Sequence, residues 1–126
     1  MQTTEQMSLT NLILASYKHR QHLSQERAVA KKLGVEPTAL SNYRKGERRM
    51  PDTAIATLAD GMDVPLGDMV AAINIGMVNT DEKQREFWLK RITKDSFRQF
   101  ATTYSESFNP SSPRKEPVKE LRQNQG

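Results

Sequence analysis

The sequence predicts an all-α protein, and three observations support this fold class. Apolar residues recur three and four positions apart along most of the chain from Leu9 to Phe108, which is the spacing of one helix face. No segment shows the apolar–polar alternation of a half-buried strand. Glycine or proline separates several of the apolar segments, as at Gly34, Pro51 and Pro65.

The first two helices are expected over residues 8–19 and 25–33. Ser24 is a suitable N-cap for the second helix, because its hydroxyl can accept a hydrogen bond from the first turn. Gly34 can adopt a positive φ, so it is expected to end that helix in a tight turn.

A third helix is expected over residues 37–44, since Pro37 suits the first helical position and Gly46 follows its end. Ile55, Leu58 and Met62 then mark one face of a fourth helix. A fifth helix is expected to begin at Pro65. Its predicted apolar side comprises Leu66, Met69, Val70, Ile73 and Met77.

The C-terminal part predicts one aromatic-rich helix over residues 80–108, because its large apolar residues keep helical spacing. Asn109-Pro110 must end it, and the Pro-rich tail over residues 109–126 is expected to be disordered. The predicted organisation is therefore a helical domain over residues 1–79, this additional helix, and the tail.

Composition and charge exclude several function classes. The chain has no cysteine and no apolar run long enough to span a membrane, so we expect a cytoplasmic protein. The histidine pair His19 and His22 lacks further metal ligands, and Asp60, Asp63 and Asp68 are interpreted as solvated helix-end charges. No enzyme pattern stands out, so neither catalysis, a metal nor a cofactor is expected.

Positive charge is concentrated in one segment. Residues 24–50 hold seven Lys or Arg against three Glu, whereas residues 51–79 hold four Asp and no Lys or Arg. Binding of a polyanion is therefore a hypothesis about residues 24–50 and not about the whole chain.

The same segment meets the steric demands of a helix-turn-helix unit. Ala30 is small where two helices would cross, and Gly34 makes the turn four residues later. In the third helix Thr38, Ser41 and Asn42 face outward, as does Lys45. Short polar side chains of this kind suit the major groove of DNA, where hydroxyls and amides can contact base edges.

The segment QERAVAKKLGVEPTALSNYRKGERRMPDTAIATLADGMDV, which begins at Gln25, resembles the Cro- and phage-repressor-type helix-turn-helix family. The similarity extends from about Leu9 to Ile73. The positions that match the family's pattern are Ala30, Gly34, Leu40, Gly46 and Pro51.

This resemblance implies a five-helix, lambda-repressor-like domain that binds a palindromic operator in double-stranded DNA as a homodimer. It implies a sequence-specific transcriptional regulator of phage or mobile-element origin, acting as a repressor by operator occupancy. The base-contacting positions carried over from the family are Thr38, Ser41 and Asn42. The positions that approach the DNA backbone are Gln25, Arg44, Lys45, Arg48 and Arg49.

Some residues depart from the family's pattern. Glu26 stands where a glutamine often contacts the backbone, and its charge would repel phosphate, so Gln25 is expected to substitute. Pro37 offers only apolar contact to a base. Gly61 and Asp63 replace the alanine-type residue and the turn glycine after the fourth helix.

The aromatic residues of the C-terminal part have two interpretations. Six of the eight aromatic residues lie between Phe87 and Phe108, either as core of the same domain or as a dimer or partner interface. The second interpretation admits a rival function. In it the protein is an antitoxin or anti-repressor, whose residues 80–126 bind and neutralise a partner protein.

Overall fold

The computed structural model describes residues 8–107, all of whose regular elements are helices; the predicted disordered tail lies outside these residues. The all-α prediction is thereby confirmed. The seven helices of this part of the chain are α1 (Leu9–Arg20), α2 (Glu26–Leu33), α3 (Pro37–Arg44), α4 (Asp52–Met62), α5 (Leu66–Ile75), α6 (Glu82–Leu89) and α7 (Asp95–Ser107).

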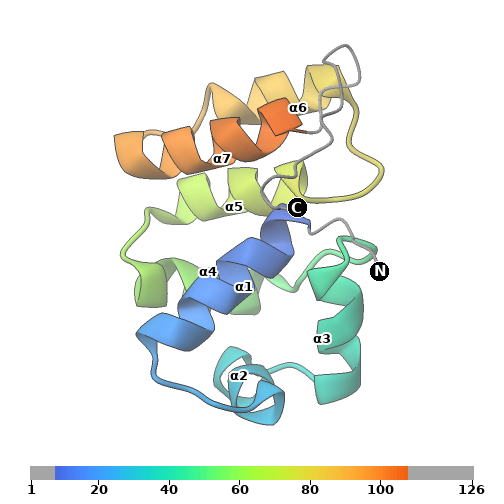
Figure 1. Cartoon of the computed structure of the whole chain (residues 1–126), viewed down its shortest axis with the longest axis vertical. Coiled ribbons are helices and arrows are strands. Elements are labelled where there is room, and N and C mark those ends of the chain that lie inside the picture. Colours follow the sequence, from blue (N-terminus) through green and yellow to red (C-terminus); the bar gives the residue numbers. More distant parts are fainter. Residues whose placement is uncertain (1–7, 108–126) are drawn as a thin grey trace, which may run out of the picture.

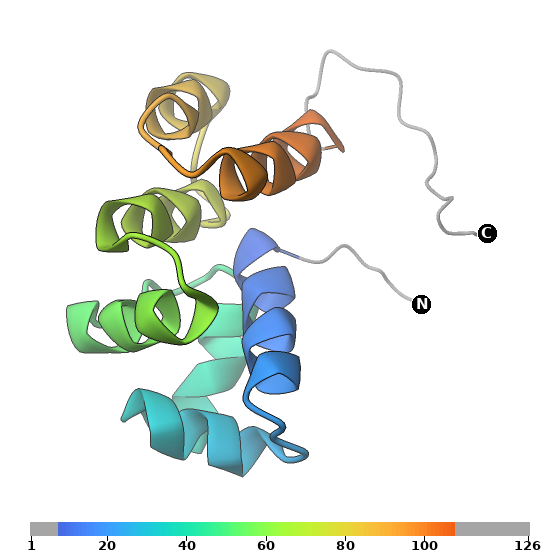
Figure 2. The ribbon, with the colours of Figure 1, turned by 90° about the vertical axis from the view of Figure 1, so that its left-hand side faces the viewer.

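The helices are stacked along the long axis of the molecule (Figure 1). α6 and α7 lie side by side over α5 at one end, α4 and α1 follow, and α2 lies at the other end. The same order is visible from the side (Figure 2). α3 packs against α1 and α2, so the helix pair α2–α3 and the helix pair α6–α7 are well separated.

The turn between α2 and α3 follows the sequence prediction. Gly34 has φ +73°, and the N–H of Val35 donates to the carbonyl of Ala30 at 3.0 Å. This arrangement satisfies carbonyls at the end of α2 that have no partner within the helix. Pro37 then occupies the first turn of α3.

The two unusual residues at the end of α4 have local reasons. Asp63 takes the left-handed conformation, with φ +57°, that the family's glycine would take. Gly61 makes room for the ring of Tyr17, because a Cβ at position 61 would lie 2.4 Å from Tyr17 Cε1. The departures from the family's pattern therefore still produce a helix end, packed closely on α1.

The predicted single helix over residues 80–108 is wrong, because the chain forms two helices there. α6 begins with a capping box in which Asp81 and Gln84 each accept a hydrogen bond from the other's backbone N–H. The chain then turns at residues 90–94 before α7. The periodicity of apolar residues continues across this turn, so it did not reveal the break.

A buried carboxylate fixes the turn between α6 and α7. The Asp68 side chain, only 2% exposed, accepts hydrogen bonds from the backbone N–H of Thr93 at 3.0 Å and of Lys94 at 2.8 Å. The Thr93 hydroxyl also donates to it. The interpretation of Asp68 as a solvated charge is therefore wrong, since it organises the start of α7 from α5.

One core cluster includes residues from both ends of the stack. Ile92, Phe97 and Ala101 belong to the same buried cluster as the residues of α1 to α5. Tyr104 hydrogen-bonds the Leu9 backbone, which links α7 to the start of α1; burial raises the pKa of Tyr104, and that bond opposes the rise. No helix within residues 8–107 has the length and apolar character that crossing a membrane requires.

Candidate nucleic-acid interface

α3 presents a polar face outward and an apolar face inward. Leu40 and Tyr43 are buried, whereas Thr38 and Ser41 are exposed and Asn42 is half-buried. The spacing of the three polar residues places them on one side of the helix, together with exposed Lys45. The structure thus brings the predicted base-contacting residues together on one accessible face.

Arg44 points away from that face and ties α3 to two other helices. Its Nε donates to Glu26 Oε1 of α2 at 2.8 Å, and its Nη1 donates to Asn11 Oδ1 of α1 at 2.7 Å. The Ser8 hydroxyl also donates to the Arg44 carbonyl at the end of α3. Arg44, a predicted phosphate contact, therefore has most of its polar contacts inside the protein.

The charge of Glu26 is neutralised within the same network. Its Oε2 accepts from Lys18 Nζ at 2.9 Å, and its Oε1 accepts from Arg44. Partial burial raises the pKa of Glu26, but hydrogen bonds and charge from Lys18 and Arg44 outweigh it and hold the pKa below its ordinary value. The acid that the sequence placed near phosphate is therefore paired with two cations.

Gln25 takes a different place from the one predicted. It is itself the N-cap of α2, where Ser24 was expected, and its side chain makes no capping hydrogen bond. Gln25 is exposed, so its amide stays available at the start of α2. This is compatible with the predicted backbone contact.

The basic loop, residues 45–50, is docked on the end of α5. Gly46 has φ +76°, and a Cβ there would lie 2.3 Å from the Gly76 carbonyl oxygen. The Gly46 carbonyl accepts from the Val78 N–H at 2.9 Å. A glycine is required here by both backbone conformation and close approach, and the contact fixes the loop next to α3.

Two arginines of the basic loop are exposed and make only weak contacts. The Arg48 guanidinium lies 5.8 Å from the centroid of the Tyr43 ring. Arg49 Nη1 lies 3.1 Å from Asp52 Oδ1, and the Asp52 side chain is 88% exposed. Exposed pairs of this kind contribute little to stability, so both guanidinium groups can exchange these contacts for phosphate.

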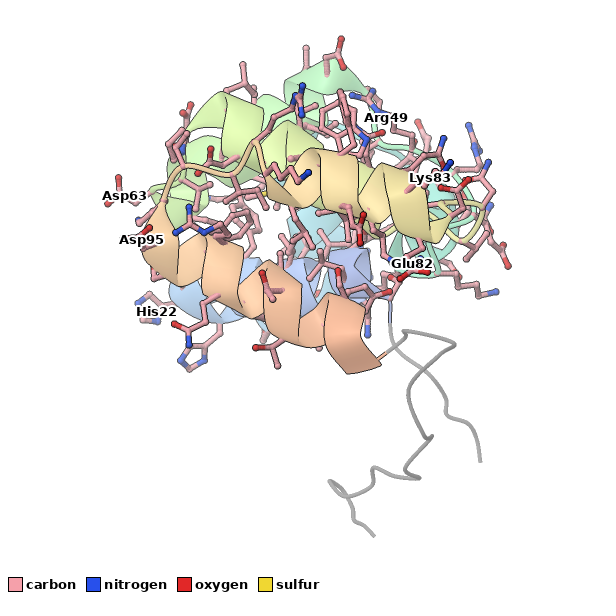
Figure 3. All side chains as sticks on the ribbon, turned by 90° about the horizontal axis from the view of Figure 1, so that it is seen from above. His22, Arg49, Asp63, Glu82, Lys83 and Asp95 are labelled. Atoms are coloured by element: carbon pink, nitrogen blue, oxygen red, sulfur yellow. The ribbon has the colours of Figure 1, made fainter. Side chains whose placement is uncertain are left out.

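The acidic residues are distributed over more than one side of the molecule. Asp52 lies beside the basic loop, whereas Asp63 and Asp95 lie at the opposite end from Arg49 when the molecule is seen from above (Figure 3). The sequence placed all four aspartates of residues 51–79 together. In the structure Asp52 pairs with Arg49, Asp63 lies 3.9 Å from Lys94 Nζ, Asp68 is buried and Asp60 is exposed.

Sequence reasoning missed the residues that hold α3 in place. Ser8 is the N-cap of α1, Asn11 and Lys18 lie on α1, and the three contact residues 8 to 36 positions away. Helical spacing cannot reveal such contacts, because they depend on how three helices cross. In the sequence, only the position of Glu26 among Lys and Arg residues could have indicated these contacts.

Within residues 8–107 there is no group of three His, Cys, Asp or Glu side chains placed to hold a metal ion. In comparisons with known proteins, no family model, curated protein or solved structure matches this chain. The resemblance to the Cro- and phage-repressor-type family thus stays a prediction from the motif residues.

Proposed function

We propose that the protein is a sequence-specific regulator that binds double-stranded DNA through α3. The observation that carries the proposal is the accessible polar face of Thr38, Ser41 and Asn42 beside a basic loop. Side-chain hydroxyls and amides can distinguish base pairs in the major groove, and cations nearby supply affinity for phosphate.

In this mechanism α3 enters the major groove and its polar side chains contact base edges. Gln25, Lys45, Arg48 and Arg49 approach phosphates on either side of the groove. Arg44 was predicted to contact phosphate, but in this mechanism it positions α3 instead. Its hydrogen bonds to Glu26 and Asn11 orient α3, so the reading face is held before DNA arrives.

Regulation would follow from occupancy. A protein bound over a promoter excludes polymerase sterically, which makes repression the simplest outcome of such binding. Origin in a phage or mobile element belongs to this proposal through the family resemblance alone.

A homodimer is part of the proposal, because one such unit contacts too few base pairs to select a site in a genome.

The exposed large apolar residues of the described chain support the C-terminal half as the dimer interface. They are Leu66, Val78, Phe87 and Phe100. Phe87 is 47% exposed on α6, and Phe100 is 38% exposed on α7. Phe97 and Ala101 of α7 lie in the core, and Trp88, Leu89 and Tyr104 pack against it, so Phe87 and Phe100 are the large apolar side chains of these two helices that are exposed within the described residues.

Selection from a pool of random double-stranded DNA tests the function with the full chain. We expect one enriched motif with two inverted half-sites about one helical turn apart. Asn42→Ala should weaken binding to that motif by about 1–3 kcal/mol and leave binding to random DNA almost unchanged. Gln99→Ala, exposed on α7, is the matched control and should change neither. Equal binding of all DNA by wild type and Asn42→Ala would contradict the proposal.

A further inference from the structure

Glu36 stands at the leading end of α3 without a partner. It is the N-cap residue, it is exposed, and its side chain makes no capping hydrogen bond. No hydrogen bond or ion pair of its carboxylate occurs with the described residues 8–107. Helix N-caps favour Ser, Thr, Asp and Asn, so starting the helix does not explain a glutamate here.

Two other acidic residues near the reading face have partners, and a third, Glu47 of the basic loop, is exposed without an ion pair but lies beyond α3. Glu26 is paired with Lys18 and Arg44, and Asp52 is paired with Arg49. Their charges are therefore offset close to where DNA would lie. Glu36 has no such partner at the start of α3, where the residues of a recognition helix approach base edges.

An unpaired carboxylate near phosphates weakens binding of the protein to DNA by charge repulsion, unless the carboxylate accepts a hydrogen bond from the DNA. In the major groove the base edges offer two donors, the amino groups at cytosine N4 and adenine N6. The adenine amino group lies beside the N7 acceptor, which disfavours an approaching carboxylate. Cytosine is thus the better partner for Glu36.

We propose that Glu36 is a specificity-determining residue that selects a C·G base pair in each half-site by accepting a hydrogen bond from cytosine N4. The inference rests on the proposed function and names one base pair within the motif. Glu36 favours one base pair and does not raise affinity for all DNA, because where no amino group is within reach its charge meets acceptors and phosphates and is repelled.

The test compares motifs selected from random DNA by the full-length wild type, Glu36→Gln, Glu36→Ala and Glu47→Gln. Glu47 is the matched control, because it is also an exposed glutamate without an ion pair in the described chain, but it lies in the basic loop beyond α3. All these positions are exposed, so the unfolding midpoints should equal that of wild type.

We expect wild type to prefer C·G at one position of each half-site by about tenfold. Glu36→Ala should lose that preference, and Glu36→Gln should move it toward A·T, because an amide can pair with adenine N6 and N7. Glu47→Gln should keep the wild-type motif. All Gln variants should bind random DNA several-fold more tightly, since each removes a negative charge.

The two ways of failing are distinct. Identical motifs for wild type and both Glu36 variants would overturn this inference and leave the proposed function standing. A wild-type protein that enriches no sequence would overturn the proposed function, and this inference with it.

Discussion

The helix pairs α2–α3 and α6–α7 are each fixed by a carboxylate, but Glu26 belongs to α2 itself, whereas Asp68 comes from α5, and their surroundings differ. Glu26 holds α3 through Arg44 at the surface, where its side chain is 50% exposed. Asp68 holds the start of α7 from inside the protein, where it is 2% exposed. The contacts of Glu26 therefore lie on a charged, solvent-exposed surface, whereas those of Asp68 lie in a buried junction.

This difference extends to what each pair exposes. α3 exposes short polar groups next to the basic loop, whereas α6 and α7 expose Phe87 and Phe100. Arg91 covers part of this apolar surface, with its guanidinium 3.6 Å from the centroid of the Phe87 ring. The comparison therefore separates a surface suited to a polyanion from a surface suited to another apolar surface.

The largest effect is expected at Gly46, where the basic loop beside α3 contacts the end of α5. Gly46→Ala adds a Cβ that would lie 2.3 Å from the Gly76 carbonyl oxygen, in a backbone with φ +76°. We expect a loss of about 4 kcal/mol in the free energy of unfolding, from strain and overpacking together. Urea unfolding followed by circular dichroism measures it.

Gly34→Ala is the matched control for that change. Gly34 has nearly the same φ, +73°, but a Cβ there would meet nothing within 4 Å. Only the backbone conformation is then strained, so the expected loss is about 1 kcal/mol. Equal losses at the two glycines would mean that the contact between the basic loop and α5 is unimportant.

The buried carboxylate should be the next most sensitive point. Asp68→Ala removes the acceptor of the Thr93 and Lys94 backbone N–H groups and leaves them without a partner at the start of α7. The expected loss is about 2–3 kcal/mol in the free energy of unfolding. Hydrogen exchange should locate the loss in α7, and retained protection of α7 amides would argue against this role for Asp68.

Glu26→Gln should have a smaller effect, because the ion pairs it removes are at the surface. We expect a loss of about 0.5–1 kcal/mol at neutral pH. Lys18 and Arg44 hold the folded-state pKa of Glu26 below its ordinary value of 4.5, despite the opposing effect of partial burial. The charged form therefore stabilises the folded state above that value, and the contribution disappears as the pH falls through the lowered pKa.

Unfolding of wild type and Glu26→Gln across a pH series measures this dependence. The difference between the two proteins should be constant from pH 7 down to about pH 5 and vanish in more acidic buffer. A difference that stays unchanged at acidic pH would show that packing, and not charge, explains the effect of Glu26.

The sequence predicted the α2–α3 region well because its determinants are local. Gly34, Pro37 and the spacing of Leu40 and Tyr43 act within a few residues, so the ends of α3 were predicted correctly. The break between α6 and α7 depends instead on Asp68, 25 residues earlier than Thr93. Likewise the inward turn of Arg44 depends on Asn11, 33 residues away. Contacts between distant residues leave no periodic pattern in the sequence.

The smallest change in stability is expected in the basic loop, where the salt dependence of DNA binding distinguishes the α2–α3 region from the α6–α7 region. Arg48→Ala and Arg49→Ala should each change stability by less than about 0.5 kcal/mol, because neither side chain is buried. On DNA, each lost phosphate contact should lower the slope of log affinity against log salt concentration by about 1, for preferred and random DNA alike.

Lys90→Ala provides the matched control, since Lys90 is an exposed cation at the end of α6, far from α3. Its slope should equal that of wild type. Affinities measured by fluorescence anisotropy at several salt concentrations decide the matter. An equal reduction for Lys90→Ala would mean that DNA also follows α6 and that polyanion binding is not confined to the α2–α3 region. An unchanged slope in the double variant of Arg48 and Arg49 would make the basic loop an ordinary solvated surface.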